Sequence, residues 1–395
     1  MADYTGYETI YDYCSVLESG HHTITLANSI QIPVEVIRIE SNLSIDNNYL
    51  TSTSFGDGIE DTEMLILISE YDITVEKDTV LCPAVRKKGF VIYCNGTLTN
   101  NGTISMTARG AKGDGEDVLL YKNDDDTYEF IPAIGGAGGP SAVMSYEGRV
   151  PGLKSADGIN RQTGGGASGS AFRGASYAYT VRSGAGGAGT SYSGGAGGGG
   201  ISARERNWTG YSGSSAGGAG GNGLSNYETR GYCGGGGAGN PGGVGNYQGS
   251  ANANYSGKNG TGGLLIIYAN TYINNGTVSA DGVEGGLANT RVPASGGSSG
   301  GGSVNIFYSE MINAETSITT ANGGAAQAYG GCAGANGCVT FTQIDFIPHT
   351  KNKYVSYHSF IRFMRQYTRK ITGGIDSVSP YEPQEIIDMV NNLWG

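Results

Sequence analysis

Tyrosine, tryptophan and arginine residues recur in short segments between residues 134 and 263, where they are separated by runs of glycine. Tyr and Trp offer a large contact area at little cost in conformational entropy, and Arg, Ser and Asn offer adaptable hydrogen bonds. Aromatic faces also suit the rings of sugars. The composition therefore predicts a set of binding loops, whose expected contact residues are Tyr177, Tyr179, Arg204, Arg206, Trp208, Tyr211, Tyr227, Arg230, Tyr232, Tyr247 and Tyr255.

Two other interpretations of the polar and aromatic residues stay open. The tyrosines can serve only to seal the ends of glycine segments and to pack on a sheet, so the binding prediction concerns the set and not any single residue. A pair of carboxylates about 5–10 Å apart would indicate cleavage of a glycan. The candidates for such a pair are Asp281, Glu284, Glu310 and Glu315, but none recurs in a way that turn chemistry leaves unexplained, so no catalytic residue is predicted.

The glycine runs have a period of three. In the longest run, residues 234–245, the non-glycine residues Ala238, Pro241 and Val244 lie three apart. A polyproline II helix has about three residues per turn, so two faces of each rod would be bare and could lie against neighbouring rods. Collagen would require far more proline than the 10 residues present, and a flexible linker, the remaining alternative, needs no threefold phase.

A second pattern repeats outside the glycine-rich stretch. Residues 89–104 align without a gap to residues 263–278, and a third copy covers residues 302–316. Residues 337–344 resemble the first strand of a fourth copy, and residues 64–75 a degenerate earlier one. Each copy reads as a strand, a polar turn and a short second strand. One such unit cannot bury its apolar face, whereas stacked copies can, as in a solenoid or a layered sheet.

These patterns predict a mainly β fold, a repeated strand-turn-strand scaffold that is solenoid-like or layered. It carries an inserted bundle of glycine-rich polyproline II helices and a short helical C-terminus. The expected parts are an N-terminal β attachment region, the first part of the scaffold, the glycine-rich domain with its aromatic loops, the second part of the scaffold, and a helical cap or docking segment. Their boundaries are 1–60, 61–133, 134–263, 264–347 and 348–395.

Charge and cysteine content narrow the function classes. The net charge of -11 disfavours nucleic acid, whose phosphates call for a basic face. No apolar stretch is long enough to span a bilayer, and the first 15 residues lack the features of a signal peptide.

The six cysteines fit neither a zinc site nor a dense disulfide scaffold, although a bridge between Cys332 and Cys338 stays open. The acidic tip at residues 122–126 is expected to be a solvated turn and not a calcium site. No metal and no cofactor are predicted.

Glycine runs in a threefold phase, separated by aromatic loops and mounted on a β scaffold, resemble the receptor-binding adhesins at the tail-fibre tips of T-even-type phages. The resemblance covers residues 134–263 and lies in architecture and composition. The segment at residues 96–105, Gly-Thr-Leu-Thr-Asn-Asn-Gly-Thr-Ile-Ser, is also similar to phage tail-fibre and tailocin proteins. The repeated β units and the expected C-terminal helices depart from the adhesin pattern.

The resemblance implies a receptor-binding component of a phage or phage-tail-like particle, assembled in the host cytoplasm and located in the tail fibre or baseplate. Its implied partners are a bacterial surface glycan or protein and other tail-fibre or baseplate proteins, with a homotrimer among the expected assembly states. A tailspike-like polysaccharide depolymerase and a purely structural tail or surface protein are the alternative classes.

Overall fold

The computed structural model describes residues 4, 6–46, 63–110, 118–131, 202–204, 225–226, 231–233, 244–245, 259–283, 300–325, 333–334 and 336–346. All of them belong to Met1–Pro348, the first of two units into which the chain divides; the second is His349–Gly395. More than half of the described residues lie in strands, which confirms the prediction of a mainly β protein. The predicted helical segment at 348–395 and most of the predicted glycine-rich domain lie outside the described residues.

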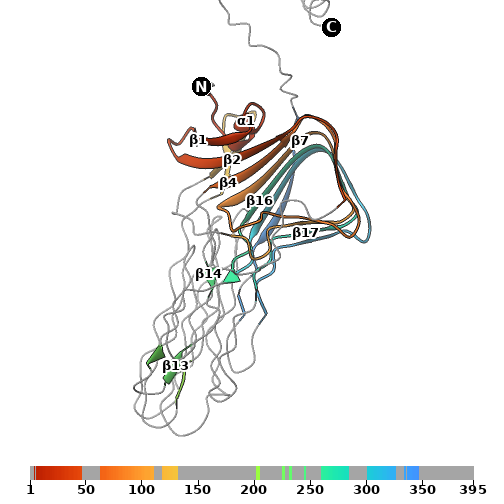
Figure 1. Ribbon diagram of the computed structural model, residues 1–395. Helices are drawn as coiled ribbons and strands as arrows, with labels where there is room; N and C mark the ends of the chain where they lie inside the picture. The colour runs from red at the N-terminus through yellow and green to blue at the C-terminus, as the bar shows by residue number, and fades with distance from the viewer. Residues whose placement is uncertain are drawn as a thin grey trace, which may run out of the picture. The chain divides into compact units, whose positions relative to one another are not determined.

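A nine-stranded sheet forms the main layer of the scaffold, with seven strands in the order β1-β2-β4-β7-β16-β18-β20 and two more, β3 and β5, beside them. From β2 onward the neighbours in this order are parallel (Figure 1). The strands are β1 (Gly20–Thr25), β2 (Gln31–Ile39), β3 (Leu43–Ile45), β4 (Met64–Ser69), β5 (Ile73–Val75), β7 (Gly89–Asn100), β16 (Leu264–Asn274), β18 (Ser303–Asn313) and β20 (Cys338–Gln343).

A smaller sheet of four short parallel strands has the order β19-β17-β8-β6. Its strands are β6 (Val80–Leu81), β8 (Thr103–Ser105), β17 (Thr277–Ser279) and β19 (Ile318–Thr320). Three of them follow a long strand of the main sheet after a turn of a few residues, so β7, β16 and β18 lead into β8, β17 and β19. Each of these three copies therefore contributes one long strand to the first sheet and one short strand to the second.

The predicted copies lie side by side, which confirms the repeat. Leu265 on β16 is the register partner of Val304 on β18, and Val278 on β17 is the partner of Ile104 on β8. β20 continues the series as the first strand of the fourth copy. Stacking buries these apolar residues completely, as the sequence pattern requires, because no single copy has a second layer of its own.

The ungapped alignment of residues 89–104 with 263–278 is wrong by one residue in its first half. Leu265 pairs with Phe90, whereas Asn274 pairs with Asn100, so the offset changes from 175 to 174 at an irregularity in the ladder. One extra residue in β7 lies at this bend, beside Gly96. An added Cβ at Gly96 would meet the Asp72 Oδ1 atom at 2.5 Å, so the neighbouring coil passes very close there. A shift of one residue exchanges the two faces of a strand.

The sequence analysis missed one copy, which precedes the others. Val34 on β2 pairs with Met64 on β4, and Leu43 on β3 pairs with Ile73 on β5, both in parallel register. Residues 31–45, predicted to belong to an attachment region, thus repeat the pattern of residues 64–75 and continue the same sheet. The missing signal is the turn, because residues 31–45 lack the Asn-Asn-Gly sequence that marks the copies at residues 89–104 and 263–278.

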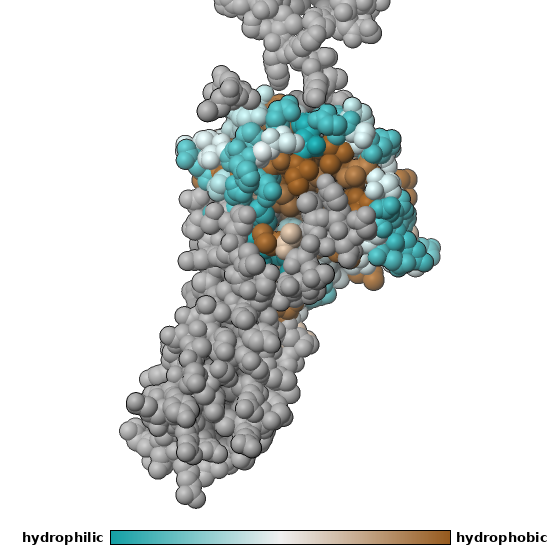
Figure 2. Space-filling model, in the orientation of Figure 1, coloured by the Kyte–Doolittle hydropathy of each residue, from teal (hydrophilic) through white to brown (hydrophobic). Residues whose placement is uncertain are grey.

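Two hydrophobic cores lie on the two faces of the main sheet. All six residues of β4 are buried, and its apolar side chains point alternately into the two cores. This pattern is typical of parallel sheets that are covered on both faces. The outer core contains Ile66, Tyr93 and Tyr268, and the inner core, shared with the four-stranded sheet, contains Leu65 and Ile267. In Figure 2 apolar residues gather in one area of the described surface and polar residues surround them.

A helix and a hairpin cover the outer core. The helix α1 (Ile10–Cys14) begins with a capping box in which Thr9 and Asp12 satisfy each other's backbone N–H groups. The predicted hairpin is present as β9 (Val118–Lys122) and β10 (Tyr128–Ile131). Tyr11 of α1 lies 5.1 Å from the ring of Tyr268, whose hydroxyl donates a hydrogen bond to the Leu120 carbonyl. Aromatic packing therefore fixes both covering elements to the sheet.

Asparagine side chains link successive copies at the turn. The Asn100 Nδ2 atom donates to Asn274 Oδ1 at 2.9 Å, and Asn275 Nδ2 donates to Asn101 Oδ1 at 2.9 Å. In the following copy, Asn313 on β18 is the register partner of Asn274. Both Asn100 and Asn274 are buried, and Asn100 Nδ2 also donates to the Thr277 carbonyl at 3.0 Å, so this amide links the two copies through side chain and backbone. The predicted equivalence of the two Asn-Asn-Gly turns is confirmed.

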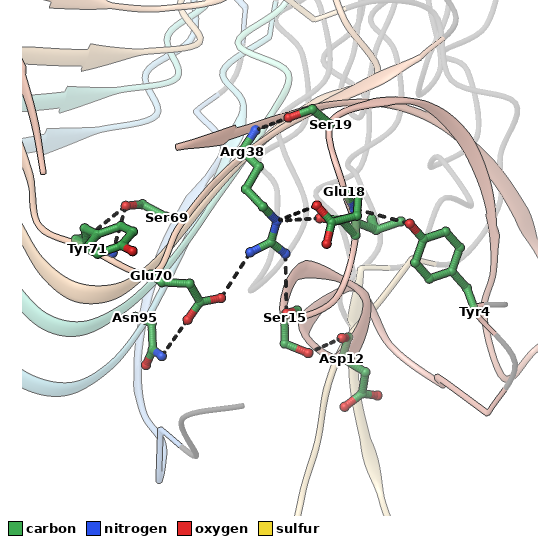
Figure 3. A network of polar contacts seen from close by, with 11 residues as sticks. Tyr4, Asp12, Ser15, Glu18, Ser19, Arg38, Ser69, Glu70, Tyr71 and Asn95 are labelled. Atoms are coloured by element: carbon green, nitrogen blue, oxygen red, sulfur yellow. Dashed lines mark hydrogen bonds and ion pairs between the residues drawn. The ribbon is translucent and has the colours of Figure 1, made fainter. Parts of the chain in front are cut away.

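A buried arginine ties the N-terminal segment to the scaffold (Figure 3). The Arg38 side chain on β2 is 3% exposed, and its Nη1 atom donates to Glu70 Oε1 at 3.1 Å. Its Nε atom donates to the Leu17 carbonyl at 2.8 Å, just after α1. The second Glu70 oxygen accepts from Asn95 Nδ2 at 2.8 Å, which carries the network into β7. One guanidinium therefore joins the α1 segment to three neighbouring strand segments.

We expect Arg38→Ala to lower the free energy of unfolding by about 2–4 kcal/mol, because it leaves buried carbonyl groups and the Glu70 carboxylate without their donor. Glu18→Ala is the matched control, since that carboxylate is 60% exposed and lies 4.0 Å from Arg38. The control should change stability by less than about 0.5 kcal/mol. Urea unfolding of the two variants measures this difference, and equal stabilities would show that the network contributes nothing.

Candidate functional site

Two of the eleven predicted receptor-binding residues lie in strands that the structure describes. Arg204 and Tyr232 lie within described strands, so their backbone positions are defined. The other nine predicted residues lie outside the described residues, and they are Tyr177, Tyr179, Arg206, Trp208, Tyr211, Tyr227, Arg230, Tyr247 and Tyr255.

A small antiparallel sheet connects three segments of the predicted binding region. Its strand order is β11-β13-β12. Arg204 pairs with Gly231, and Tyr232 pairs with both Ala203 and Ser225, so Arg204 and Tyr232 occupy successive register positions. Segments that lie almost 30 residues apart in the sequence are thereby joined through the backbone. The strands are β11 (Ser202–Arg204), β12 (Ser225–Asn226) and β13 (Gly231–Cys233), and a further pair joins β14 (Val244–Gly245) to β15 (Asn259–Gly260).

The insertions between copies begin and end at one feature of the scaffold, which we call the glycine junction. It comprises one glycine that follows β8 and the glycines that precede the long strands β16, β18 and β20. These residues are Gly110, Gly262, Gly263, Gly301, Gly302 and Gly337. Along the chain, Gly110 follows the copy that ends with β8, and Gly263, Gly302 and Gly337 directly precede β16, β18 and β20. The longest insertion, between residues 110 and 261, contains the predicted binding loops.

At the glycine junction, backbone lies against backbone with no room for a side chain. An added Cβ at Gly337 would lie 1.7 Å from the Gly302 carbonyl oxygen, and one at Gly262 would lie 1.8 Å from the Ala280 oxygen. The same atom at Gly301 would be 2.1 Å from the Ala321 oxygen. Gly302 belongs to the copy before Gly337, whereas Ala280 and Ala321 end the copies that Gly262 and Gly301 begin. All three partners are backbone atoms, so they cannot turn away as a flexible side chain could.

Hydrogen bonds cross the junction between segments that belong to neither helix nor strand. Gly302 N donates to the Ala280 carbonyl at 2.6 Å, and Gly337 N donates to the Ala321 carbonyl at 2.7 Å. Gly262 N donates to the Gly300 carbonyl at 3.2 Å. These backbone groups are thus satisfied by lateral neighbours and not by groups within their own segment.

Polar side chains reinforce the same region. The Asp281 carboxylate accepts hydrogen bonds from Asn322 N at 2.6 Å and from Thr320 Oγ1 at 2.9 Å. The Asp281 N–H group donates to Thr107 Oγ1 at 3.0 Å, so this residue joins three copies. Of the other carboxylates considered for catalysis, Glu310 lies on β18 and Glu315 in the turn after it, whereas Glu284 lies outside the described residues. Asp281 therefore has a structural role between the copies.

Cationic side chains close to the start of the first copy are also held by the scaffold. The Lys87 Nζ atom donates to Glu35 Oε2 at 2.6 Å, and the Lys87 N–H group donates to the Arg109 carbonyl at 2.9 Å. Arg109 Nε in turn donates to the Pro83 carbonyl at 3.1 Å. Both side chains are buried, and they hold the segment that leads into Gly110.

Among the described residues, the thiols of Cys14 and Cys94 and the acidic hairpin tip form neither a reactive site nor a metal site. Burial raises the pKa of the Cys94 thiol to about 12 and also raises that of Cys14, so both stay protonated at neutral pH. At the hairpin tip, Asp126 pairs with Lys122 at 3.3 Å and Asp125 accepts from Thr127. No group of three potential ligands among the described residues could hold a metal ion. Cys332, half of the bridge left open above, lies outside the described residues.

The geometry of the junction is mechanical: it holds the two ends of each insertion at fixed positions on a rigid β scaffold. The sequence analysis recognised the glycine runs of the insertion but missed the junction. The signal was present, because paired glycines precede the long strands of the second and third copies, at residues 262–263 and 301–302. Their role becomes visible only when the copies are stacked.

Comparisons with protein-family models, with curated proteins and with solved structures gave no significant match to this chain. Within the described ranges, no helix has the length and apolar character needed to cross a membrane.

We expect Gly302→Ala to destabilise the scaffold by about 3 kcal/mol or more, because its Cβ would lie 2.4 Å from the Gly263 carbonyl oxygen. Gly89→Ala is the control at the first residue of β7. Its Cβ would meet the flexible Met64 side chain at 3.1 Å, so we expect a loss of about 1 kcal/mol or less. Thermal unfolding should separate the two variants clearly; equal transition temperatures would contradict the close packing of the junction.

Proposed function

We propose that the protein is a receptor-binding component of a phage or a phage-tail-like particle. In this proposal the stacked copies form a solenoid-like scaffold, and glycine-rich segments within residues 134–263 form packed polyproline II rods. Loops between the rods carry the aromatic and arginine residues and grip a glycan or protein on the bacterial surface. Residues 348–395 form a helical cap or docking segment, and the assembled particle holds the protein in its tail fibre or baseplate, as a homotrimer.

The glycine junction is the observation that carries this proposal. Backbone segments there are hydrogen-bonded to their lateral neighbours, and their glycines approach other backbone more closely than any Cβ allows. Packed polyproline II rods require the same two features, since they have no internal hydrogen bonds and must supply bare faces to one another. The glycine runs between residues 134 and 263 repeat this composition with a threefold phase. The junction thus supplies a template from which such rods can continue.

Rigid rods would explain why so much glycine is compatible with specific binding. Fixing the backbone of one residue costs about 1–2 kcal/mol, and glycine loses the most freedom of all residues. If folding of the rods has already met that cost, the loops encounter a receptor in an ordered state and lose little further entropy. Several weak aromatic contacts, together with several copies on one particle, then add up to firm attachment.

A cell-binding assay tests the proposal. The full-length protein, labelled with a fluorophore, is incubated with a panel of bacterial strains to identify one that it binds. We expect the combined substitution of Trp208, Tyr211, Tyr227 and Tyr232 by alanine to weaken binding to that strain at least about tenfold, because aromatic anchors dominate binding surfaces. Tyr71→Ala is the control, since this tyrosine lies on the scaffold and is 44% exposed.

The outcomes separate the function classes. Undiminished binding by the folded quadruple variant would place the receptor site elsewhere. A chain that binds no strain in the panel would favour a structural role. New reducing ends after incubation with surface polysaccharide of the bound strain would indicate a depolymerase instead.

A further inference from the structure

Among the residues that the structure describes, both sheets of the scaffold end at the last copy, and we call this face the open end. β20 is the last strand of the main sheet and β19 the last of the small sheet. The second half of β18, residues 310–313, pairs with β16, but no later strand in the described part of the chain pairs with it. At the other end of the stack, β1 runs antiparallel to β2 and closes the series of parallel strands.

The open end exposes three large apolar side chains. Ile312 is 58% exposed, Ile318 is 52% exposed and Phe341 is 41% exposed. Among the described residues these are three of the four large hydrophobic side chains that are exposed to this extent. Phe341 is the register partner of Ile306, which belongs to the inner core, so the inner core reaches the surface here.

On β20, every second residue directs its backbone N–H and C=O groups away from β18. Cys338 N donates to the Gly302 carbonyl at 3.1 Å, and Ile344 N donates to the Tyr308 carbonyl at 2.9 Å. Backbone groups of a strand point alternately to its two sides, so the even-numbered residues face β18. Val339 and Phe341 therefore direct their N–H and C=O groups away from the sheet, toward the position of a further strand.

The charge of this end is uniformly negative. Residues 300–346 contain Glu310, Glu315 and Asp345 and no Lys, Arg or His. All three carboxylates are exposed, and no ion pair within the described ranges engages them. Two such ends brought together would repel each other, which disfavours a second copy of the open end as its occupant.

We propose that the open end binds an extended, basic segment of a partner protein by strand addition. The backbone of that segment pairs with Val339 and Phe341, its apolar side chains cover Phe341, and its lysine or arginine side chains face the carboxylates. An unpaired sheet edge invites such pairing, and the acidic side chains select a cationic partner over other strands. This inference concerns assembly of the scaffold with another protein and does not rest on the proposed receptor-binding function.

Fluorescence anisotropy with a defined probe tests the proposal on the full chain. The probe is a labelled ten-residue peptide in which Lys alternates with Val, at 0.15 M salt. We expect saturable binding that Glu310→Lys combined with Glu315→Lys weakens at least tenfold. The matched control combines Glu40→Lys with Asp124→Lys, two exposed carboxylates outside the open end, and gives the same change in net charge.

A second probe separates strand addition from simple charge attraction. N-methylation of alternate residues keeps every charge of the peptide but blocks one hydrogen-bonding edge, and we expect it to weaken binding at least tenfold. Equal binding of both probes, equal weakening by the two double variants, or no binding of the first probe would overturn the proposal. So would self-association in sedimentation experiments that Phe341→Lys abolishes, because a second copy would then occupy the open end.

Discussion

Lateral pairing of backbone across glycine is the constraint on which the rest of this structure depends. Copies separated by as many as 174 residues meet at register partners such as Asn100 and Asn274. The strands β16, β18 and β20 are preceded by glycines at which an added Cβ would clash with other backbone. The hydrogen bonds at Gly302 and Gly337 satisfy the backbone where strands give way to the insertions. A long insertion is tolerated because the entropy of closing a loop grows only slowly with loop length, whereas the stacked copies bury two continuous cores.

The two ends of the stack differ in how they treat an exposed sheet. At the first copies, α1 and β1 cover the apolar surface, and Arg38 satisfies carbonyl groups that follow α1. At the last copy, Ile312 and Phe341 stay exposed among carboxylates. Stacked repeats need a capped terminus because an uncapped one offers both an apolar surface and unpaired backbone. This asymmetry suits a protein that is closed at one end and joined to a partner at the other.

The sequence predicted the copies because strands of continuous apolar character recur, and in two copies an Asn-Asn-Gly turn follows the strand. It missed the copy at residues 31–45, whose turn lacks that signal, and it misplaced the register of the first half of β7 by one residue. A bulge beside Gly96 cannot be read from one strand, since it depends on how close the chain at Asp72 passes. Arg38 was missed because its partners are backbone carbonyls, which have no sequence signature. Of the predicted binding residues, only Arg204 and Tyr232 have a described backbone position, so that site stays a prediction.

The central claim is that the backbone pairing of the glycine junction continues through the glycine runs of residues 134–263. Residue-resolved hydrogen exchange of the glycine amides tests it most directly, because an isolated polyproline II segment bonds only to water, whereas a packed rod bonds to its neighbours. The account predicts slow exchange for glycines in a repeating threefold phase within the runs, comparable with Gly302 and Gly337. Exchange of the whole block at the rate of an unstructured chain would contradict it.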